Sequence, residues 1–274
     1  FMKTIAIQGI KGSYHHQVAC EYFGDDQLWE ECLTFDSLAK SLQSGKSDYA
    51  VMALENSIAG SIIPNYALID DYNLQIVGEH YLNIHHQLMA LPGSTISDIK
   101  EVASHPMALL QCKDFFDKYP QIRLLEDKDT AEVAQKISAQ KLTGIAAIAS
   151  QSAAKLYGLE ILAKNIQSIE NNATRFVILK AQSDDDIKGI NKASFKFLLD
   201  HKRGSLAAIL NVLSDCSINL TKIQSLPIIK TPWKYAFFVD VTFEDVLHYE
   251  KAKSILEIMT ESFKIHGAYK NEKQ

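Results

Sequence analysis

A threonine, an arginine and a phenylalanine stand side by side just before an apolar run in the second half of the chain. Thr174 can share or transfer a hydroxyl proton, and Arg175 can hold a carboxylate through two parallel hydrogen bonds. Phe176 can pack a cyclic substrate or anchor the strand that residues 177–179 predict. These side chains suit chemistry on a carboxylated ring. A tripeptide also arises by chance, so its weight depends on the rest of the chain.

Small hydroxyl residues recur where an expected strand ends and an expected helix begins. Each such position offers free backbone N–H groups, the positive end of a helix dipole and a hydroxyl. In an open α/β sheet these ends gather beside the ligand crevice. Each residue alone is equally a favoured helix cap, whereas several on one sheet edge suit a small, oxygen-rich anion. The residues are Ser13, Ser57, Ser104, Thr130 and Ser150.

Two further polar positions are compatible with a binding edge or with a turn. Glu55, Asn56 and Ser57 place an acid, an amide and a hydroxyl at the end of an expected strand. His105 precedes Pro106, so its backbone is pushed toward extended geometry. Both interpretations of these positions stay open at the level of the sequence.

Metal and nucleotide sites are not predicted. His85 and His86 would point to opposite faces of a strand, and no cysteine or carboxylate partner lies at ligand spacing. Gly9 and Gly12 lack the third glycine of a dinucleotide loop, and the lysine motif of a phosphate-binding loop is missing.

Length and composition indicate an ordinary globular protein. The chain has 274 residues, 47% hydrophobic and 22% charged, enough for two or three compact domains. The net charge of −5 argues against a nucleic-acid partner, and an anionic substrate must therefore be attracted by local groups. Four scattered cysteines, without C-x-x-C spacing, predict reduced thiols and a cytoplasmic location. Neither a signal peptide nor a membrane-spanning run is found, so we expect no membrane partner.

The element pattern predicts two different domains. In the first 182 residues, short apolar runs alternate with helical patterns, which favours an α/β layout with parallel sheets. The expected strands there are residues 4–7, 49–54, 74–79, 83–91 and 145–149, with a helix at 18–23. A polar, acidic break at 183–191 predicts a linker between a domain at 2–182 and another at 192–274.

The second domain shows a β-α-β-β-α-β order, which is typical of a ferredoxin-like fold. A strand at 195–199 precedes a helix at 204–214, whose apolar residues share one face. The remaining elements are an extended segment at 218–229, a strand at 235–243, a helix at 246–263 and a last strand in the tail.

Several segments, in matching order, resemble the prephenate dehydratase family. The similar family motifs are G-P-x-G-T-F, E-N-S-x-x-G, S-H-P-Q-A-L-x-Q-C, A-A-I-A-S, Y-G-L and N-x-T-R-F. Here they read as residues 9–14, 55–60, 104–112, 146–150, 157–159 and 172–176. One departure is Asn65-Tyr66-Ala67, where T-x-D is expected. Several motifs in order are specific where one would not be.

The resemblance implies a catalytic domain of two α/β subdomains around a cleft, like a periplasmic binding protein, followed by an ACT regulatory domain. It also implies a hydro-lyase that converts prephenate to phenylpyruvate, in phenylalanine biosynthesis, without a cofactor or metal. Thr174 and Arg175 would be catalytic. The substrate-binding residues would be Phe176, Ser13, Glu55, Asn56, Ser57, Ser104, His105, Ser150 and Asn172.

Regulation by phenylalanine is implied too, with the effector bound between ACT domains of a homodimer or homotetramer. The expected effector residues are Gly204, Ser205, Leu206, Ala207, Asn219 and Leu220. Residues 224–227 read Q-S-L-P where the family has E-S-R-P, so the strength of inhibition stays open. Two alternatives remain: a related dehydratase acting on arogenate, and a non-catalytic module that binds an amino acid or a dicarboxylate.

Overall fold

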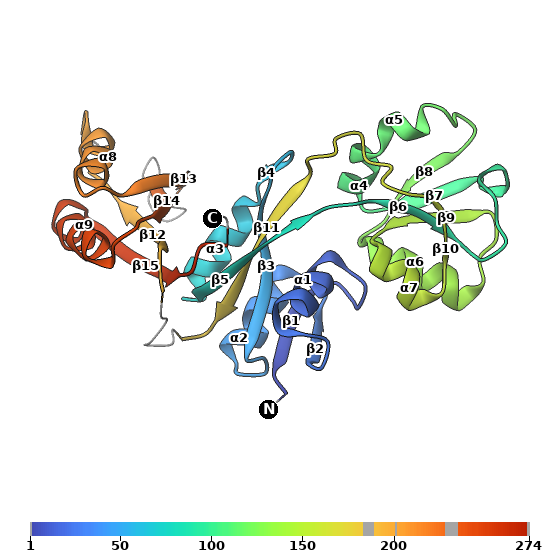
Figure 1. The fold of residues 1–274 in the computed structure, drawn as a ribbon, viewed down its shortest axis with the longest axis horizontal. Coiled ribbons are helices and arrows are strands. Elements are labelled where there is room, and N and C mark those ends of the chain that lie inside the picture. Colours follow the sequence, from blue (N-terminus) through green and yellow to red (C-terminus); the bar gives the residue numbers. More distant parts are fainter. Residues whose placement is uncertain (1, 183–188, 201, 228–234, 273–274) are drawn as a thin grey trace.

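The computed structural model describes residues 2–182, 189–200, 202–227 and 235–272. Figure 1 shows three parts in a row, with the first α/β lobe between the second lobe and a C-terminal domain. The first and second lobes are joined by two crossing segments, one after β5 and one before β11. The first lobe therefore contacts both neighbours.

The first lobe is built on a sheet with the strand order β2-β1-β3-β11-β5, and β4 pairs with β3. Its strands are β1 (Thr4–Gln8), β2 (Leu28–Cys32), β3 (Tyr49–Asn56), β4 (Gly60–Ser61), β5 (Gln75–Asn83) and β11 (Ala173–Lys180). Its helices are α1 (Tyr14–Phe23), α2 (Phe35–Gln43) and α3 (Ile63–Asp71). The apolar runs expected as central strands are buried, because helices cover the sheet.

The second lobe has a five-stranded sheet in the order β10-β6-β9-β7-β8. Its strands are β6 (Gln87–Ala90), β7 (Glu101–Ser104), β8 (Arg123–Glu126), β9 (Ile145–Ala149) and β10 (Glu160–Ala163). Its helices are α4 (Pro106–Gln111), α5 (Lys113–Phe116), α6 (Thr130–Gln140) and α7 (Gln151–Tyr157), with a 3₁₀ turn at Ile96–Asp98. Asp129 begins α6 by accepting the N–H groups of Ala131 and Glu132.

The expectation of parallel sheets is only partly correct. β1 pairs in parallel with β2 and β3, and β7 pairs in parallel with β8 and β9. However, β11 runs antiparallel to β3 and β5, and β6 runs antiparallel to β9 and β10. These two strands follow the crossings between lobes, and each enters its sheet from the other lobe. The antiparallel strand β11 contains Thr174 and Arg175.

The expected β-α-β-β-α-β order of the C-terminal domain is confirmed. Its elements are β12 (Lys192–Leu198), α8 (Ser205–Asp215), β13 (Asn219–Pro227), β14 (Tyr235–Thr242), α9 (Val246–Met259) and β15 (Ser262–Tyr269). The sheet order is β13-β14-β12-β15. Helix α9 ends before the expected residue 263 because β15 already begins at Ser262. Of the expected linker 183–191, residues 183–188 lie outside the described residues.

The C-terminal sheet packs directly on the first lobe. Phe238 and Tyr269 belong to the same buried apolar cluster as Tyr66 and Ile76 of the first lobe. At Gly267 a Cβ atom would lie 1.9 Å from the carbonyl oxygen of Ile76, so only glycine lets β15 approach β5 this closely. One continuous core therefore joins the two parts.

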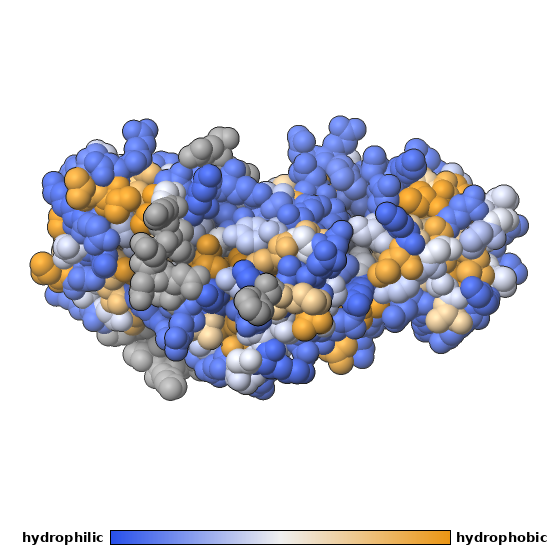
Figure 2. Space-filling model, turned by 60° about the horizontal axis from the view of Figure 1, so that its bottom comes forward, coloured by the Kyte–Doolittle hydropathy of each residue, from blue (hydrophilic) through white to orange (hydrophobic). Residues whose placement is uncertain are grey.

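Exposed apolar side chains are scattered along the chain, for example Leu33, Leu110 and Ile258. The face shown in Figure 2 is largely hydrophilic, with apolar side chains in small, separate groups. Within the described ranges, no helix is both long enough and apolar enough to cross a membrane.

Acid should weaken the interface between the C-terminal domain and the first lobe through His266. This buried ring stacks on Phe238, with centroids 4.8 Å apart, and its Nε2 lies 3.5 Å from Asp70 Oδ1. Burial is the main cause that lowers its pKa from 6.5 to about 4. The unfolded chain therefore binds more protons than the folded chain between these two values.

This contribution to stability is complete above pH 6.5 and is lost as the pH falls to about 4, and it amounts to about 3 kcal/mol. Urea denaturation followed between pH 7.5 and 4.5 measures the loss. A His266→Leu variant should show a shallower pH dependence. An equally steep dependence in that variant would contradict this assignment.

Candidate active site

Thr174 and Arg175 point to opposite faces of the first sheet. On β11, Thr174 pairs with Asn56 of β3, and Arg175 pairs with Glu55 of β3 and Tyr81 of β5. Successive side chains of a strand alternate between its faces. The side chain of Thr174 therefore faces the cleft between the two lobes, whereas the side chain of Arg175 faces the C-terminal domain.

The cleft that Thr174 faces has a volume of about 410 Å³ and lies between the lobes. Its floor includes Phe176 and Thr174 from the same face of β11. The first lobe and the crossing segment further contribute Ser13, Tyr14, His15, Asn56 and His86, and the second lobe contributes His105, Gln111, Lys128, Asp129 and Thr130. A mixed polar and aromatic lining of this kind suits a small polar ring.

The orientation of the Asn56 amide is fixed by the backbone. Its Oδ1 accepts the N–H groups of Ile58 and Ala59, both at 2.9 Å. Its Nδ2 therefore donates to Asn172 Oδ1 at 2.7 Å and to Thr174 Oγ1 at 2.9 Å. Because the threonine oxygen already accepts this bond, the Thr174 proton must be donated elsewhere. Among the described residues we find no acceptor for it, so it is available to a ligand in the cleft.

The donor and acceptor of each further hydrogen bond, from Asn172 through the second lobe to Tyr14, follow from this orientation of Asn56. Asn172 Nδ2 donates to Gln111 Oε1 at 2.8 Å, which leaves Gln111 Oε1 as the acceptor facing His86 Nε2 at 2.8 Å. His86 therefore carries its proton on Nε2, and its Nδ1 accepts from the Tyr14 hydroxyl at 2.8 Å. Burial lowers the pKa of His86, which keeps the ring neutral. We call the connected residues Tyr14, His86, Gln111, Asn172, Asn56 and Thr174 the amide chain.

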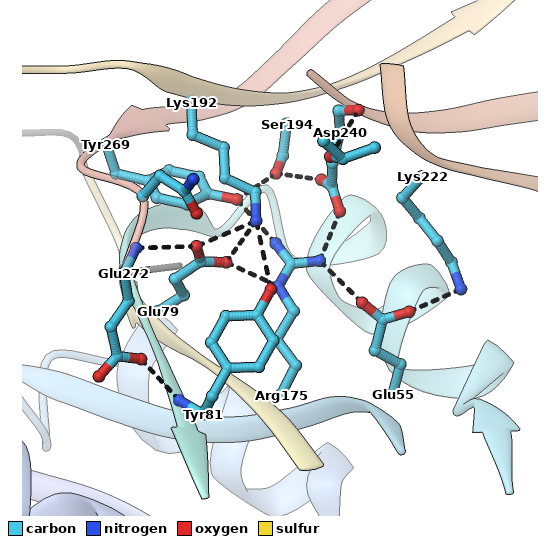
Figure 3. A network of polar contacts seen from close by, with 12 residues as sticks. Glu55, Glu79, Tyr81, Arg175, Lys192, Ser194, Lys222, Asp240, Tyr269 and Glu272 are labelled. Atoms are coloured by element: carbon cyan, nitrogen blue, oxygen red, sulfur yellow. Dashed lines mark hydrogen bonds and ion pairs between the residues drawn. The ribbon is translucent and has the colours of Figure 1, made fainter. Parts of the chain in front are cut away.

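The structure corrects the expectation that Arg175 grips a carboxylate beside Thr174. Its side chain is buried on the opposite face, where it donates to Glu79 at 2.7 Å, to the Tyr269 hydroxyl at 2.8 Å and to Asp240 (Figure 3). Burial opposes its charge, but Asp240, Tyr269 and Glu79 hold its pKa well above the usual value. The reason is the two-residue period of the strand, which places neighbouring side chains on different faces.

Four other residues expected in the cleft have their side chains elsewhere. Ser104 is fully buried and donates to the Ile148 carbonyl at 2.7 Å. Ser150 donates to the Gly12 carbonyl at 2.8 Å, where the second lobe touches the first. The other two lie on the Arg175 side: Glu55 pairs with Lys222 of the C-terminal domain, and Ser57 donates to the Asn171 carbonyl. Glu55 and Ser57 flank Asn56, so the alternation of side chains turns them away from the cleft. Ser104 and Ser150 are instead used in hydrogen bonds to backbone carbonyl groups.

The expected residues that do meet in the cleft are Ser13, Asn56, His105, Thr174 and Phe176, and Asn172 lies buried behind them. Ser13 and His105 also cap α1 and α4 by accepting backbone N–H groups, so both of their proposed roles are compatible. The cleft also contains polar and aromatic residues to which the sequence assigned no part in substrate binding: Tyr14, His15, His86, Gln111, Lys128 and Asp129. They come from distant segments, and only the folded chain brings them together.

Removing the Arg175 charge should destabilise the fold strongly. Arg175→Met leaves Glu79 and Asp240 buried with one cation fewer, which typically costs about 3–5 kcal/mol. Arg175→Lys keeps the charge but loses the planar fork, so its loss should be smaller. Urea denaturation measures both. Lys40→Met, which breaks an exposed pair with Asp36, is the control and should unfold like the wild type. A wild-type midpoint for Arg175→Met would contradict the role of this network.

A two-lobed α/β unit with a hydroxyl donor in its interlobe cleft, joined to a β-α-β-β-α-β domain, fits an enzyme that acts on a small ring compound. Comparison with known proteins makes this specific. The prephenate dehydratase family model matches residues 5–184, and the chain belongs to that family. The chain is thus a dehydratase, that is, a hydro-lyase.

Curated relatives span nearly the whole chain. A bifunctional chorismate mutase/prephenate dehydratase of Buchnera aphidicola subsp. Acyrthosiphon pisum is 35% identical, covering 97% of this chain and 70% of the relative. The chloroplastic arogenate dehydratase/prephenate dehydratase 2 of Arabidopsis thaliana is 38% identical, covering 94% of this chain and 69% of the relative. The family thus contains relatives named for either of two substrates.

Solved structures share the whole fold. The prephenate dehydratase of Staphylococcus aureus is 26% identical with a TM-score of 0.83, covering 97% of this chain and 99% of that one. A protein described as GqqA, a novel type of quorum quenching acylase, is 28% identical with a TM-score of 0.87, covering 99% of both chains. The prephenate dehydratase of Arthrobacter aurescens in complex with L-Phe is 24% identical with a TM-score of 0.87, covering 99% and 91%, and shows the fold alone.

Proposed function

We propose that the chain converts prephenate to phenylpyruvate, with Thr174 donating a hydrogen bond to the departing hydroxyl. The observation that carries this role is the Thr174 hydroxyl, whose oxygen accepts from Asn56 and whose side chain lines the cleft, so that its proton is left for a ligand there. In the reaction the bond to one carboxylate breaks and its electron pair enters the ring. The ring C–O bond breaks in the same process, so carbon dioxide and hydroxide leave and the ring becomes aromatic.

Thr174 assists by stabilising the negative charge that develops on the leaving oxygen. A preorganised donor aimed at developing charge is among the largest single contributions to enzyme catalysis. A threonine alkoxide is a poor product of proton loss, so hydrogen bonding to the departing oxygen is the role that we assign. Phe176 lies on the same face of β11 and can pack the ring.

The substrate carboxylates need partners other than Arg175. The cleft offers the ammonium group of Lys128, together with His105, both from the second lobe and both exposed. We propose that these two groups hold the dianion from the side opposite Thr174. This arrangement places one contact on each lobe, so substrate binding favours a closed cleft.

The decisive experiment follows product formation by absorbance, with prephenate and arogenate supplied in parallel. Turnover of prephenate supports the proposal. Preference for arogenate, in which an amino group replaces the keto group, would instead assign the chain to the alternative substrate. Binding of either compound without turnover would support the non-catalytic module.

We further propose that residues 2–182 form a catalytic domain resembling a periplasmic binding protein, and that residues 192–274 form an ACT domain that senses phenylalanine. The length of α8 supports binding of phenylalanine between two such domains. This helix has 11 residues and spans about 16 Å. Gly204 caps its start, whereas Asn219 follows its end. One phenylalanine cannot contact both within a single chain, but two domains packed in opposite directions could supply one residue each.

Two of the expected effector residues, Leu206 and Leu220, pack against the core of their own domain. We therefore assign phenylalanine binding to the remaining four, which are Gly204, Ser205, Ala207 and Asn219. Equilibrium dialysis with phenylalanine, combined with light scattering to measure the mass of the homo-oligomer, tests this assignment. Absence of binding would remove it without affecting the proposed reaction.

A further inference from the structure

The side chains that surround Arg175 come from two domains. Glu79 and Glu55 belong to the first lobe, whereas Asp240 and Tyr269 belong to the C-terminal domain. Figure 3 shows the guanidinium group at the centre of these contacts. Arg175 is only 2% exposed, and its partners come from both sides of the interface between the first lobe and the C-terminal domain.

The network extends further into the C-terminal domain. The Ser194 hydroxyl donates to Asp240 and lies 2.7 Å from the Tyr269 hydroxyl. Lys192 donates to Glu79 at 2.8 Å and 3.0 Å. Burial raises the pKa of Asp240, but Arg175, Ser194 and Lys192 outweigh it and hold that pKa below its usual value. Charges of both signs are thus matched across the interface, and displacing the C-terminal domain would leave buried charges without partners.

Thr174 and the residue that orients its hydroxyl, Asn56, are each next in sequence to a member of this network. Thr174 precedes Arg175, and Asn56 follows Glu55. The two pairs lie opposite each other on β11 and β3, next to an irregularity in the strand pairing between Arg175 and Phe176. Such bulges reorient side chains near active sites. Movement of Arg175 and Glu55 on one face therefore moves the Asn56–Thr174 pair on the other.

We propose that Asp240 and Tyr269 of the C-terminal domain are positioning residues for the dehydration, because they fix Arg175 and thereby aim the Thr174 hydroxyl. The inference rests on the dehydratase function proposed above. It gives the C-terminal domain a part in turnover even in the absence of any effector. It also gives the buried Arg175 a function that does not require contact with the substrate.

The test compares two variants of this network with a matched variant elsewhere in the same interface. Asp240→Asn removes one charge, and Tyr269→Phe removes one hydroxyl, with little change in volume. Each should lower kcat for prephenate about 10-fold and leave KM within about 2-fold of the wild type. Asp70→Asn is the control. Asp70 binds Lys264 at 2.8 Å and also Lys196, so it joins the same two domains, but its ion pairs involve neither β3 nor β11.

The control should keep the wild-type kcat. An equal loss of kcat in Asp70→Asn would overturn the proposal, because domain docking alone would then explain the effect. In a Thr174→Val background, Tyr269→Phe should cause no further loss of the residual turnover, since both changes act on one hydroxyl. A full additional loss there would also overturn it.

Two checks keep the outcome interpretable. The thermal midpoint of each variant shows whether it is folded at the assay temperature, and Tyr269→Phe serves as the milder variant if Asp240→Asn unfolds. A wild-type protein that turns over neither prephenate nor arogenate would refute the proposed function itself. An active wild type with a normal kcat in both network variants would refute only the positioning role.

Discussion

Thr174→Val should lower kcat for prephenate by about 10²–10⁴-fold and leave KM nearly unchanged. Valine has almost the same shape as threonine but cannot donate to the departing oxygen. Binding is preserved because the carboxylate partners that we assign lie on the second lobe. The loss should therefore appear in the transition state only. Steady-state kinetics of phenylpyruvate formation measure the change.

Thr174→Ser is the matched control for this prediction. Serine restores the hydroxyl, and Asn56 Nδ2 can still donate to its oxygen, as it does to Thr174 at 2.9 Å. Without the methyl group the side chain has more rotamer freedom, so we expect most but not all of the activity. If Thr174→Val retained the wild-type kcat, the proposed role of the hydroxyl would have to be abandoned. A rise in KM alone would instead make Thr174 a binding residue.

Much of the architecture could be predicted from local patterns. Buried apolar runs such as Ile145–Ala149 gave strands, and the C-terminal element order followed from periodicity. Strand direction was not predictable in the same way. Local periodicity does not record which neighbour a strand joins, and β11 enters its sheet from the other lobe. The consequence is an antiparallel strand, β11, between β3 and β5 of the sheet that was expected to be parallel.

Only part of the site was predicted correctly from the sequence, and the alternation of side chains along β11 explains why. Thr174 and Phe176 share a face of β11, so a two-residue period already separates them from Arg175. The sequence contained this signal, but the chemistry of adjacent side chains suggested a joint role. No local signal linked Tyr14 to His86 or His86 to Gln111, because these partners lie 72 and 25 residues apart.

Asn56→Asp should reverse the polarity at Thr174 and lower kcat by about 10²-fold or more. One carboxylate oxygen can still accept from Ile58 and Ala59, as the amide oxygen does at 2.9 Å. The other oxygen would replace the Nδ2 donor, so the Thr174 hydroxyl would donate to it instead of to the substrate. A hydroxyl-to-carboxylate bond is roughly twice as strong as a neutral one, so the substrate would compete for that proton poorly. The added negative charge should also raise KM for a dianion.

Asn165→Asp makes the same chemical change outside the amide chain. Asn165 accepts from Gln87 at 3.1 Å through its oxygen, which an aspartate preserves, and kcat should stay near the wild-type value. Steady-state kinetics of Asn56→Asp and Asn165→Asp show whether the loss of kcat comes from the reversed hydrogen bond at Thr174 or from the added charge alone. Asn56→Ala removes the donor without adding a charge, and it leaves the threonine proton free to reach the substrate. Its kcat should therefore exceed that of Asn56→Asp. The reverse order would show that Asn56 acts by holding the loop at residues 57–59 and not by directing the Thr174 proton.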